Sequence, residues 1–485
     1  MNPDRRVAKN AFLNTFKTLL INLFPVLTYP YIARVLGVET VGKYTFSASI
    51  VSYFFLLAGL GINGYAIREG ARIRDDKKAM NRFASEIFAI NLYSTVAAYL
   101  LLALTVAVST KLRGYSAIIL ILSSEIMLNT LSLNWVYNVY EDYVFTTNCS
   151  LILQLLSLVG MFLFVRSEED LLLYAAISVL SRYGYAFITF FYARRYVRLS
   201  PVLKPNRKHL KPVFIMFFSM IAATIYISSD VTILGWICGD RKVGLYDTAS
   251  KTYMIAKNLI NAAIAVTIPR MSYLIGNDER EEAQRFGKTI IDVLLMISLP
   301  MAVGLCMISR PMVILYAGTA FAEAFRPLQI LSVALCFAVA ANFYANCILM
   351  SLRKEHVIMI AMIISAAVNI GLNFILIPLF AENAAALTTV IAEIIVFTIS
   401  YVVSNRHLLV RPDRKNLACA VAGCIGIAAV CRLMETFIAR PLYLVLADIF
   451  VSVLVYALIQ VVTGNKVIKG MICAVRAGKK DKKAL

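Results

Sequence analysis

Long apolar segments recur through almost the whole chain and are separated by short polar breaks. A membrane-spanning helix needs roughly 20 consecutive, mostly apolar residues, and runs of this length follow one another from the N-terminal region almost to the C-terminus. With 60% hydrophobic and 16% charged residues, the chain is too apolar for a soluble protein, in which about a quarter of the residues are charged. The sequence therefore predicts an all-α integral membrane protein with about fourteen transmembrane helices.

The net charge of +20 follows the predicted membrane topology. When the N-terminus is placed inside, the inner loops and tails hold about three times as many Lys and Arg residues as the outer loops, which is the bias of cytoplasmic segments. In a soluble chain this charge would indicate a nucleic-acid partner, but topology accounts for it here. We expect a multi-pass protein of the cytoplasmic membrane with both termini in the cytoplasm and no nucleic-acid partner.

A polar turn between apolar runs occurs twice. The segment RVLGVETVGKY at residues 34–44 aligns without a gap with WICGDRKVGLY at residues 236–246. The two glycines, the third valine and the tyrosine of the first segment match identical residues in the second. This internal repeat predicts two pseudo-symmetric six-helix lobes, followed by a C-terminal helix pair. The expected organisation is an N-terminal lobe at 1–193, a basic, proline-containing cytoplasmic linker at 194–211, a C-terminal lobe at 212–404, a helical hairpin at 405–463 and a basic cytoplasmic tail at 464–485.

Charged residues inside the predicted spans are candidate functional residues, because a charge in lipid is costly unless it faces water or a partner. Four lie near the centre of the bilayer by their position along the helices: Glu125, Arg182, Lys257 and Glu393. Each lobe thus has one central acid and one central base. These residues either form buried pairs that stabilise helix packing or, with Lys251, line a cationic cavity that binds a phosphate or diphosphate.

Acidic residues in such a cavity are candidate ion-coupling groups, because intramembrane carboxylates mark proton and ion pathways. Asp230, Glu125 and Glu393 are the candidates for a proton or sodium site. Lys251 also lies one helical turn after Asp247, so an ion pair within this helix is an alternative interpretation of these two residues.

Several asparagines and a tryptophan lie inside the predicted spans and are candidate sugar contacts. Asn129, Trp135 and Asn342 are the named candidates, because carboxamides bond hydroxyl groups and an indole ring packs on a sugar face. Asparagines in membrane helices also form hydrogen bonds between helices. Both interpretations stay open for these residues.

No metal, cofactor or catalytic motif stands out. The nine cysteines are scattered without a C-x-x-C pair, which indicates neither a disulfide framework nor a zinc site. His209, His356 and His407 fall in separate inner basic loops, and we expect them to be solvated rather than metal ligands. A Walker A sequence does not occur, so direct ATP drive by this chain is not expected. The sequence predicts no bound cofactor and a protein that is not an enzyme.

Three segments, together with Asn10 and Pro25, resemble a known family. They are PYIARVLGVETVGKYTFSASIVSYF at residues 30–54, LAGLGINGYAIREGAR at residues 57–72 and SSDVTILGWICGDRKVGLYDTASK at residues 228–251. Over essentially its whole length, the chain resembles the polysaccharide (O-antigen type) flippases of the multidrug, oligosaccharidyl-lipid and polysaccharide exporter superfamily. The two glycine and tyrosine turns are the most specific part of this resemblance.

The resemblance implies two six-helix lobes related by a pseudo-twofold axis along the membrane normal, and transport by alternating access. It implies that the substrate is an undecaprenyl-diphosphate-linked oligosaccharide, moved from the inner to the outer leaflet, with membrane lipids and polysaccharide polymerase machinery as further partners. It also implies a cationic cavity. The residues of this chain that fit such a cavity are Lys251, Lys257, Arg182, Lys17 and Arg34.

Three alternatives are weaker. A drug or cation antiporter of the same superfamily needs a net acidic cavity, whereas Lys251 makes the charges here net basic. A peptidoglycan lipid-precursor flippase has arginine-rich first helices, which Lys17 and Pro25 do not match. A polysaccharide polymerase or ligase needs a large outer loop or catalytic domain, and the longest outer break here, residues 309–325, is short.

Overall fold

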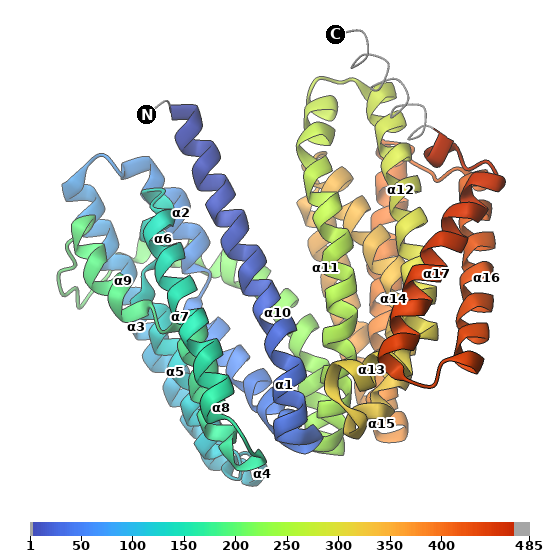
Figure 1. The fold of residues 1–485 in the computed structure, drawn as a ribbon. Coiled ribbons are helices and arrows are strands. Elements are labelled where there is room, and N and C mark those ends of the chain that lie inside the picture. Colours follow the sequence, from blue (N-terminus) through green and yellow to red (C-terminus); the bar gives the residue numbers. More distant parts are fainter. Residues whose placement is uncertain (1–2, 470–485) are drawn as a thin grey trace. The chain divides into compact units, whose positions relative to one another are not determined.

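A computed structural model describes the backbone of residues 3–469 and the side chains of residues 26–469 apart from six, which are Ser219, Ala222, Ala223, Ile225, Tyr226 and Ile227 (Figure 1). All regular elements in the described part are helices, and 11 of them are long and apolar enough to cross a membrane. These observations confirm the all-α membrane fold. The exact number of spans stays a prediction.

Contacts divide the chain into two compact units, Met1–Gly244 and Leu245–Leu485. The N-terminal unit contains α1 (Pro3–Gly59), α2 (Ile62–Ile73), α3 (Lys77–Val108), α4 (Thr110–Arg113), α5 (Ser116–Ser132), α6 (Asn134–Val139), α7 (Tyr143–Phe164), α8 (Leu171–Tyr183), α9 (Ala186–Tyr192) and α10 (Leu210–Cys238). Because α10 packs along α1, it belongs to this unit by its contacts. The division into lobes by the sequence repeat is a separate criterion and stays a prediction.

The C-terminal unit begins within α11 (Asp240–Gly276). It continues with α12 (Arg280–Met307), α13 (Ser309–Ala317), α14 (Phe325–Asn342), the short π-helix η5 (Phe343–Leu349), α15 (Glu355–His407), α16 (Arg414–Phe437) and α17 (Pro441–Val462). In this unit α14 packs on α15, α16 packs on α17, and α12 contacts both α14 and α16.

The helices α1 and α15 each contain a break. They are 57 and 53 residues long, far more than the roughly 20 residues of a single span. Gly37 interrupts α1 with φ 74° and ψ 173°, and Ala381 interrupts α15 with φ 48° and ψ −125°. Glycine has no Cβ and adopts positive φ without steric cost, whereas alanine is strained there.

The predicted repeat adopts the same backbone shape twice. Gly239, which matches Gly37, has φ 83° and ψ −180°. The next matched glycines make reciprocal contacts: an added Cβ at Gly42 would lie 1.8 Å from the carbonyl oxygen of Asp240, and one at Gly244 would lie 2.1 Å from that of Val38. In the repeat, Val38 corresponds to Asp240. The two copies therefore pack on each other with local twofold symmetry inside the N-terminal unit, at a distance that only glycine permits.

Asp413 joins the start of α16 to its neighbours. Its carboxylate accepts a hydrogen bond from the backbone N–H of Lys415 at 2.9 Å and lies 2.7 Å from Lys466 Nζ and 3.5 Å from Lys288 Nζ. The hydrogen bond from Lys466, then that of the Lys415 N–H, lowers the pKa of Asp413 to about 2. Asp413 is thus both a helix cap and the centre of a small charge cluster.

We expect Asp413→Ala to lower the free energy of unfolding by about 1 kcal/mol, the usual cost of losing a helix N-cap. Because the folded pKa of Asp413 lies below the ordinary value, the further contribution of its charge is complete at neutral pH and is lost as the pH falls from about 4 toward 2. Unfolding of wild type and variant in detergent, measured from pH 7 downward, checks the difference. Asp413→Asn, which keeps the cap and removes the charge, should show a smaller loss; a deficit that is independent of pH would contradict the charge cluster.

Candidate functional site

The basic residue predicted near the bilayer centre of the N-terminal lobe contacts the predicted acid. Arg182 on α8 places Nη1 3.7 Å from Oε2 of Glu125 on α5, and its Nη2 donates a hydrogen bond of 2.8 Å to the hydroxyl of Tyr44 on α1. Glu125 is buried, whereas the Arg182 side chain is 48% exposed. Tyr44 belongs to the first glycine turn. Its repeat position was visible in the sequence, but its contact with Arg182 was not.

In the acid and base pair of the C-terminal unit, the charged atoms lie closer together and both side chains are more buried. Lys257 Nζ on α11 lies 2.6 Å from Oε1 of Glu393 on α15, and the hydroxyl of Tyr253 donates to the same oxygen at 3.5 Å. The Lys257 ammonium also lies 5.6 Å from the centre of the Tyr253 ring. Only 19% of the lysine side chain and 7% of the glutamate side chain are exposed. Removing one partner of such a pair would leave an unpaired buried charge.

Lys251 forms an ion pair within its own helix. Its Nζ lies 2.6 Å from Oδ2 of Asp247, one turn earlier on α11, and its side chain is 34% exposed. The intrahelical alternative raised by the spacing is therefore the observed geometry. All three cations, Arg182, Lys251 and Lys257, have a carboxylate partner. An anionic ligand that binds to one of them has to compete with that carboxylate.

The other two predicted cavity cations are on α1. Lys17 lies outside the residues whose side chains are described. Arg34 is exposed, and its Nη1 donates a hydrogen bond of 2.8 Å to the carbonyl oxygen of Pro30, one turn earlier. It lies one turn before the break at Gly37.

Asp230 is buried on α10, next to a polar seam between α10 and α1. It is close enough to Tyr53 to interact with it electrostatically, and the Tyr53 hydroxyl lies 3.0 Å from Thr232 Oγ1. Thr232 in turn donates to Ser49 Oγ at 2.9 Å. This acid therefore lies near the Tyr53 hydroxyl of the neighbouring helix α1.

Asn342 lies in a chain of carboxamides in the C-terminal unit. Its Nδ2 donates to Asn261 Oδ1 at 2.6 Å, and its Oδ1 accepts a hydrogen bond from Asn346. It joins α14 to α11, as expected for an asparagine that holds helices together.

The other two candidate sugar contacts lie in one pocket. Asn129 and Trp135 line a cavity of about 410 Å³ in the N-terminal unit, together with Asn63, Asn134 and Tyr183. The sequence identified the residue types but gave no sign that the break between α5 and α6 brings them together. No charged residue is among the described residues that line this cavity.

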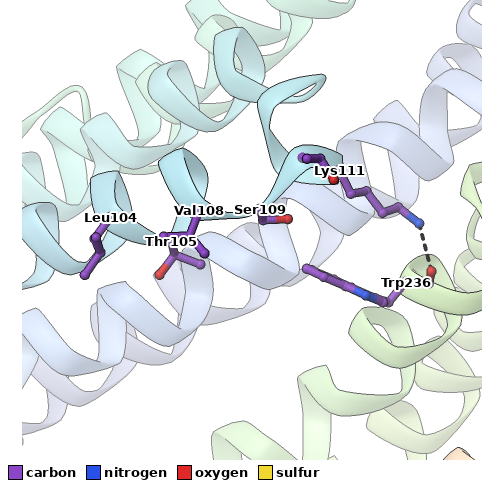
Figure 2. Close-up of a pocket in the computed structure, with 7 residues that line it drawn as sticks. Leu104, Thr105, Val108, Ser109, Lys111 and Trp236 are labelled. Atoms are coloured by element: carbon purple, nitrogen blue, oxygen red, sulfur yellow. Dashed lines mark hydrogen bonds between the residues drawn. The ribbon is translucent and has the colours of Figure 1, made fainter.

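A second, more open hollow lies where α3 ends against α10 in the N-terminal unit. Figure 2 shows Lys111 extending toward Trp236, whose backbone oxygen accepts a hydrogen bond of 3.0 Å from Lys111 Nζ; the Gly235 carbonyl accepts another. The Lys111 ammonium thus satisfies carbonyl groups at the C-terminal end of α10. We assign this lysine a structural role.

The expectation for His209 was wrong. His209 is 2% exposed, and its Nε2 lies 2.8 Å from Glu86 Oε2 on α3 while its Nδ1 lies 2.7 Å from the hydroxyl of Tyr65 on α2. The basic linker packs into the N-terminal unit here, a tertiary contact that loop composition does not reveal. His356 and His407 are exposed, as expected.

Comparison with known proteins gives matches of several kinds. A family model described as "Polysaccharide biosynthesis protein" matches residues 7–275. A "Putative O-antigen transporter" of Escherichia coli (strain K12) is 24% identical over 254 residues, which cover 52% of this chain and 61% of that protein. A protein of Shigella dysenteriae with the same description is 25% identical over 259 residues and is covered over 64% of its length. The chain therefore matches less than two thirds of the length of these relatives.

A solved structure described as "Lipid II flippase MurJ, inward closed conformation" superposes with a TM-score of 0.76 at 16% identity, covering 94% of this chain and 100% of that one. An inward-facing multidrug resistance transporter of the MATE family and MOP superfamily superposes with a TM-score of 0.59 at 15% identity, covering 79% of this chain and 93% of that one. At these identities the likeness shows a shared fold.

Proposed function

Because the chain belongs to the polysaccharide biosynthesis protein family, which agrees with the resemblance in its sequence, we propose that it is a lipid-linked saccharide flippase. In this proposal it moves an undecaprenyl-diphosphate-linked oligosaccharide from the inner to the outer leaflet of the cytoplasmic membrane for surface polysaccharide biosynthesis. The description of the Escherichia coli relative as an O-antigen transporter and the flippase-like fold support the proposal.

The observation that carries the proposal is that three cations, Arg182, Lys251 and Lys257, lie in apolar helices beside carboxylates. A diphosphate group binds strongly to guanidinium and ammonium groups, and it competes best where the existing partner is distant or exposed. Arg182 fits this requirement most closely, because it is half-exposed and 3.7 Å from Glu125. We propose that Arg182 binds the diphosphate during transport and returns to Glu125 after release.

In this mechanism the carboxylates return the cations to their resting ion pairs after each transport cycle. When the diphosphate leaves, Glu125 and Glu393 reclaim their cations and prevent an unpaired buried charge. We propose that Asp230, Glu125 and Glu393 also include the ion-coupling group, with protonation or sodium binding favouring one conformation. A polysaccharide polymerase that uses the flipped lipid is the proposed functional partner.

Reconstitution in liposomes tests the proposal. The probe is a fluorescent polyprenyl-diphosphate-linked trisaccharide, and its movement between leaflets is measured by a quencher that does not cross the membrane. We expect Arg182→Ala to slow movement at least tenfold, which corresponds to the loss of about 1.4 kcal/mol of binding. Arg182→Lys should recover only part of the rate, because lysine lacks the planar fork of donors.

Arg285→Ala is the matched control, because this arginine is 83% exposed on α12 and outside the proposed site. The same vesicles are tested with an organic cation in place of the lipid. Movement of the lipid that does not depend on the protein, or transport of the cation alone, would contradict the flippase assignment.

A further inference from the structure

The pocket of about 410 Å³ in the N-terminal unit has an unusual lining. None of the described residues that form its wall carries a charge. The polar ones are Ser52, Asn63, Asn91, Asn129, Thr130, Ser132, Asn134, Tyr183 and Thr224. Four asparagines line this one cavity: Asn63 is exposed, and Asn91, Asn129 and Asn134 are half-buried. Carboxamides within a membrane protein need hydrogen-bond partners, which the fold, water or a ligand can supply.

Helices are broken where they meet this pocket. The break between α1 and α2 contains Leu60 with φ 44° and Gly61 with φ 69°, and the break between α5 and α6 contains Leu133 with φ 47°. The helix α8 ends at Tyr183, another lining residue. Non-helical backbone at membrane depth is tolerated where it is packed in protein or lines a wet cavity, and broken helices commonly form the substrate sites of transporters.

Some polar groups of the wall are already used by the fold. Asn91 Nδ2 donates to the carbonyl oxygen of Ala58 at 2.9 Å, and Asn134 Nδ2 donates to the Tyr185 hydroxyl at 3.2 Å. These bonds hold the helix breaks in place. Asn91 and Asn134 therefore help to hold the framework of the pocket and use part of their hydrogen-bonding capacity to do so.

Other polar groups of the wall are available. Among the residues with described side chains, the carboxamides of Asn63 and Asn129, the hydroxyl of Tyr183 and the indole N–H of Trp135 make no hydrogen bond with another residue. Both carboxamides offer donors and acceptors together. The pocket can thus bond a ligand whose hydroxyl groups both give and accept hydrogen bonds.

Aromatic rings supply the rest of the recognition surface. Phe55 and Tyr183 pack with ring centres 5.6 Å apart. Trp135 also lines the pocket from the start of α6, where it is 4% exposed and packs edge-on against Phe83. Ring faces pack on apolar surfaces, such as the C–H face of a sugar ring. Because no charged side chain lines the pocket, a phosphate, a uronic acid or an organic cation would find no countercharge in the wall itself, which favours an uncharged ligand there.

The pocket also lies next to the Arg182 and Glu125 pair. Asn129 follows Glu125 by one turn of α5, so their side chains project from the same face, and Tyr183 directly follows Arg182 on α8. A ligand with a diphosphate at Arg182 and a sugar attached to it would have its sugar directed along the same helices toward Asn129.

We propose that this pocket binds an uncharged sugar of the lipid-linked substrate, with Asn63, Asn129 and Trp135 as its contacts. The proposal rests on the proposed function for the identity of the substrate, but sugar binding is a separate property. It makes the pocket a specificity site that selects neutral sugars and rejects charged ones, while Arg182 binds the diphosphate.

The test measures binding without transport. The chain has two tryptophans, so Trp236→Phe leaves Trp135 in the pocket as the single fluorescent reporter. The purified variant is titrated with free N-acetylglucosamine, galactose and a neutral trisaccharide, and in parallel with glucuronic acid and inorganic diphosphate. We expect a saturable change in Trp135 emission with at least one neutral sugar and none with the two anions.

In the same background, Asn63→Ala and Asn129→Ala should each weaken sugar binding about fivefold, the effect of losing one net hydrogen bond. Asn148→Ala, an exposed asparagine of α7 outside the wall, is the matched control and should bind as the reporter variant does. Thermal unfolding of each variant shows that the fold is intact.

The possible outcomes separate the two proposals. If no neutral sugar changes the emission while the liposome assay shows lipid movement, the pocket assignment is overturned and the flippase remains. A larger saturable change in Trp135 emission with glucuronic acid or diphosphate than with every neutral sugar also overturns it. Sugar binding without lipid movement would support the pocket and contradict the proposed function.

Discussion

Lys257→Ala is expected to abolish export of the lipid-linked saccharide and to lower the free energy of unfolding by about 3 kcal/mol. The variant leaves Glu393 buried without the ammonium that lies 2.6 Å from it. Tyr253 remains as a partner, but its 3.5 Å hydrogen bond is too long to replace the ion pair. Surface polysaccharide, accumulation of lipid-linked repeat units inside the cell and thermal unfolding of the purified variant are the three measurements.

A double variant separates a structural role of this pair from a transport role. Lys257→Met with Glu393→Leu replaces the two charges by apolar side chains of similar volume, and such replacements of buried pairs are often neutral or stabilising. We expect the double variant to regain stability and to remain inactive in export. Normal export by the double variant would show that Lys257 only stabilises helix packing, and would remove it from the mechanism.

Gly244→Ala and Gly42→Ala are expected to have the largest effects on folding. The new Cβ atoms would lie 2.1 Å from the carbonyl oxygen of Val38 and 1.8 Å from that of Asp240. Because the opposing atoms are backbone, no side chain can turn away, and the helices have to separate. We expect a loss of about 3 kcal/mol or more, with little folded protein recovered from membranes.

A graded series of glycine variants checks that explanation. Gly371 in α15 has no atom within 4 Å of an added Cβ, so Gly371→Ala should be neutral or slightly stabilising. Gly239→Ala meets no neighbour either, but its φ of 83° makes alanine strained, which costs about 1–3 kcal/mol. Size-exclusion profiles and thermal unfolding rank the stability of these variants. A stable Gly244→Ala variant with wild-type unfolding would contradict the close reciprocal contact.

Some parts of the site followed from the sequence. The acid and base that were placed near the bilayer centre in each half proved to be contacting pairs, Glu125 with Arg182 and Glu393 with Lys257. The depth of a residue along an apolar run is set by the rise of the helix, and two opposite charges at one depth in lipid have few partners besides each other. That reasoning did not predict that Tyr44 and Tyr253 contact these pairs. Tyrosine is common in membrane spans and uncharged, so its presence alone does not mark a functional site.

Other parts followed only from the fold. His209 lies in a basic linker, yet Glu86 and Tyr65 enclose it. The pocket around Asn129 depends in part on the helix break at Leu133, whose positive φ no local pattern indicates, since leucine rarely adopts that conformation.

By itself, the sequence determined an all-helical membrane chain, its repeat and its family. Apolar length and repeated glycines are local properties, and lipid forces such segments to satisfy their backbone hydrogen bonds as helices. Only the tertiary structure determined that the two glycine turns contact each other. It also determined which polar groups around Asn129 and Trp135 form hydrogen bonds within the protein and which stay available for a ligand. These depend on distances between helices far apart in the sequence, and such distances are set by packing and not by local composition.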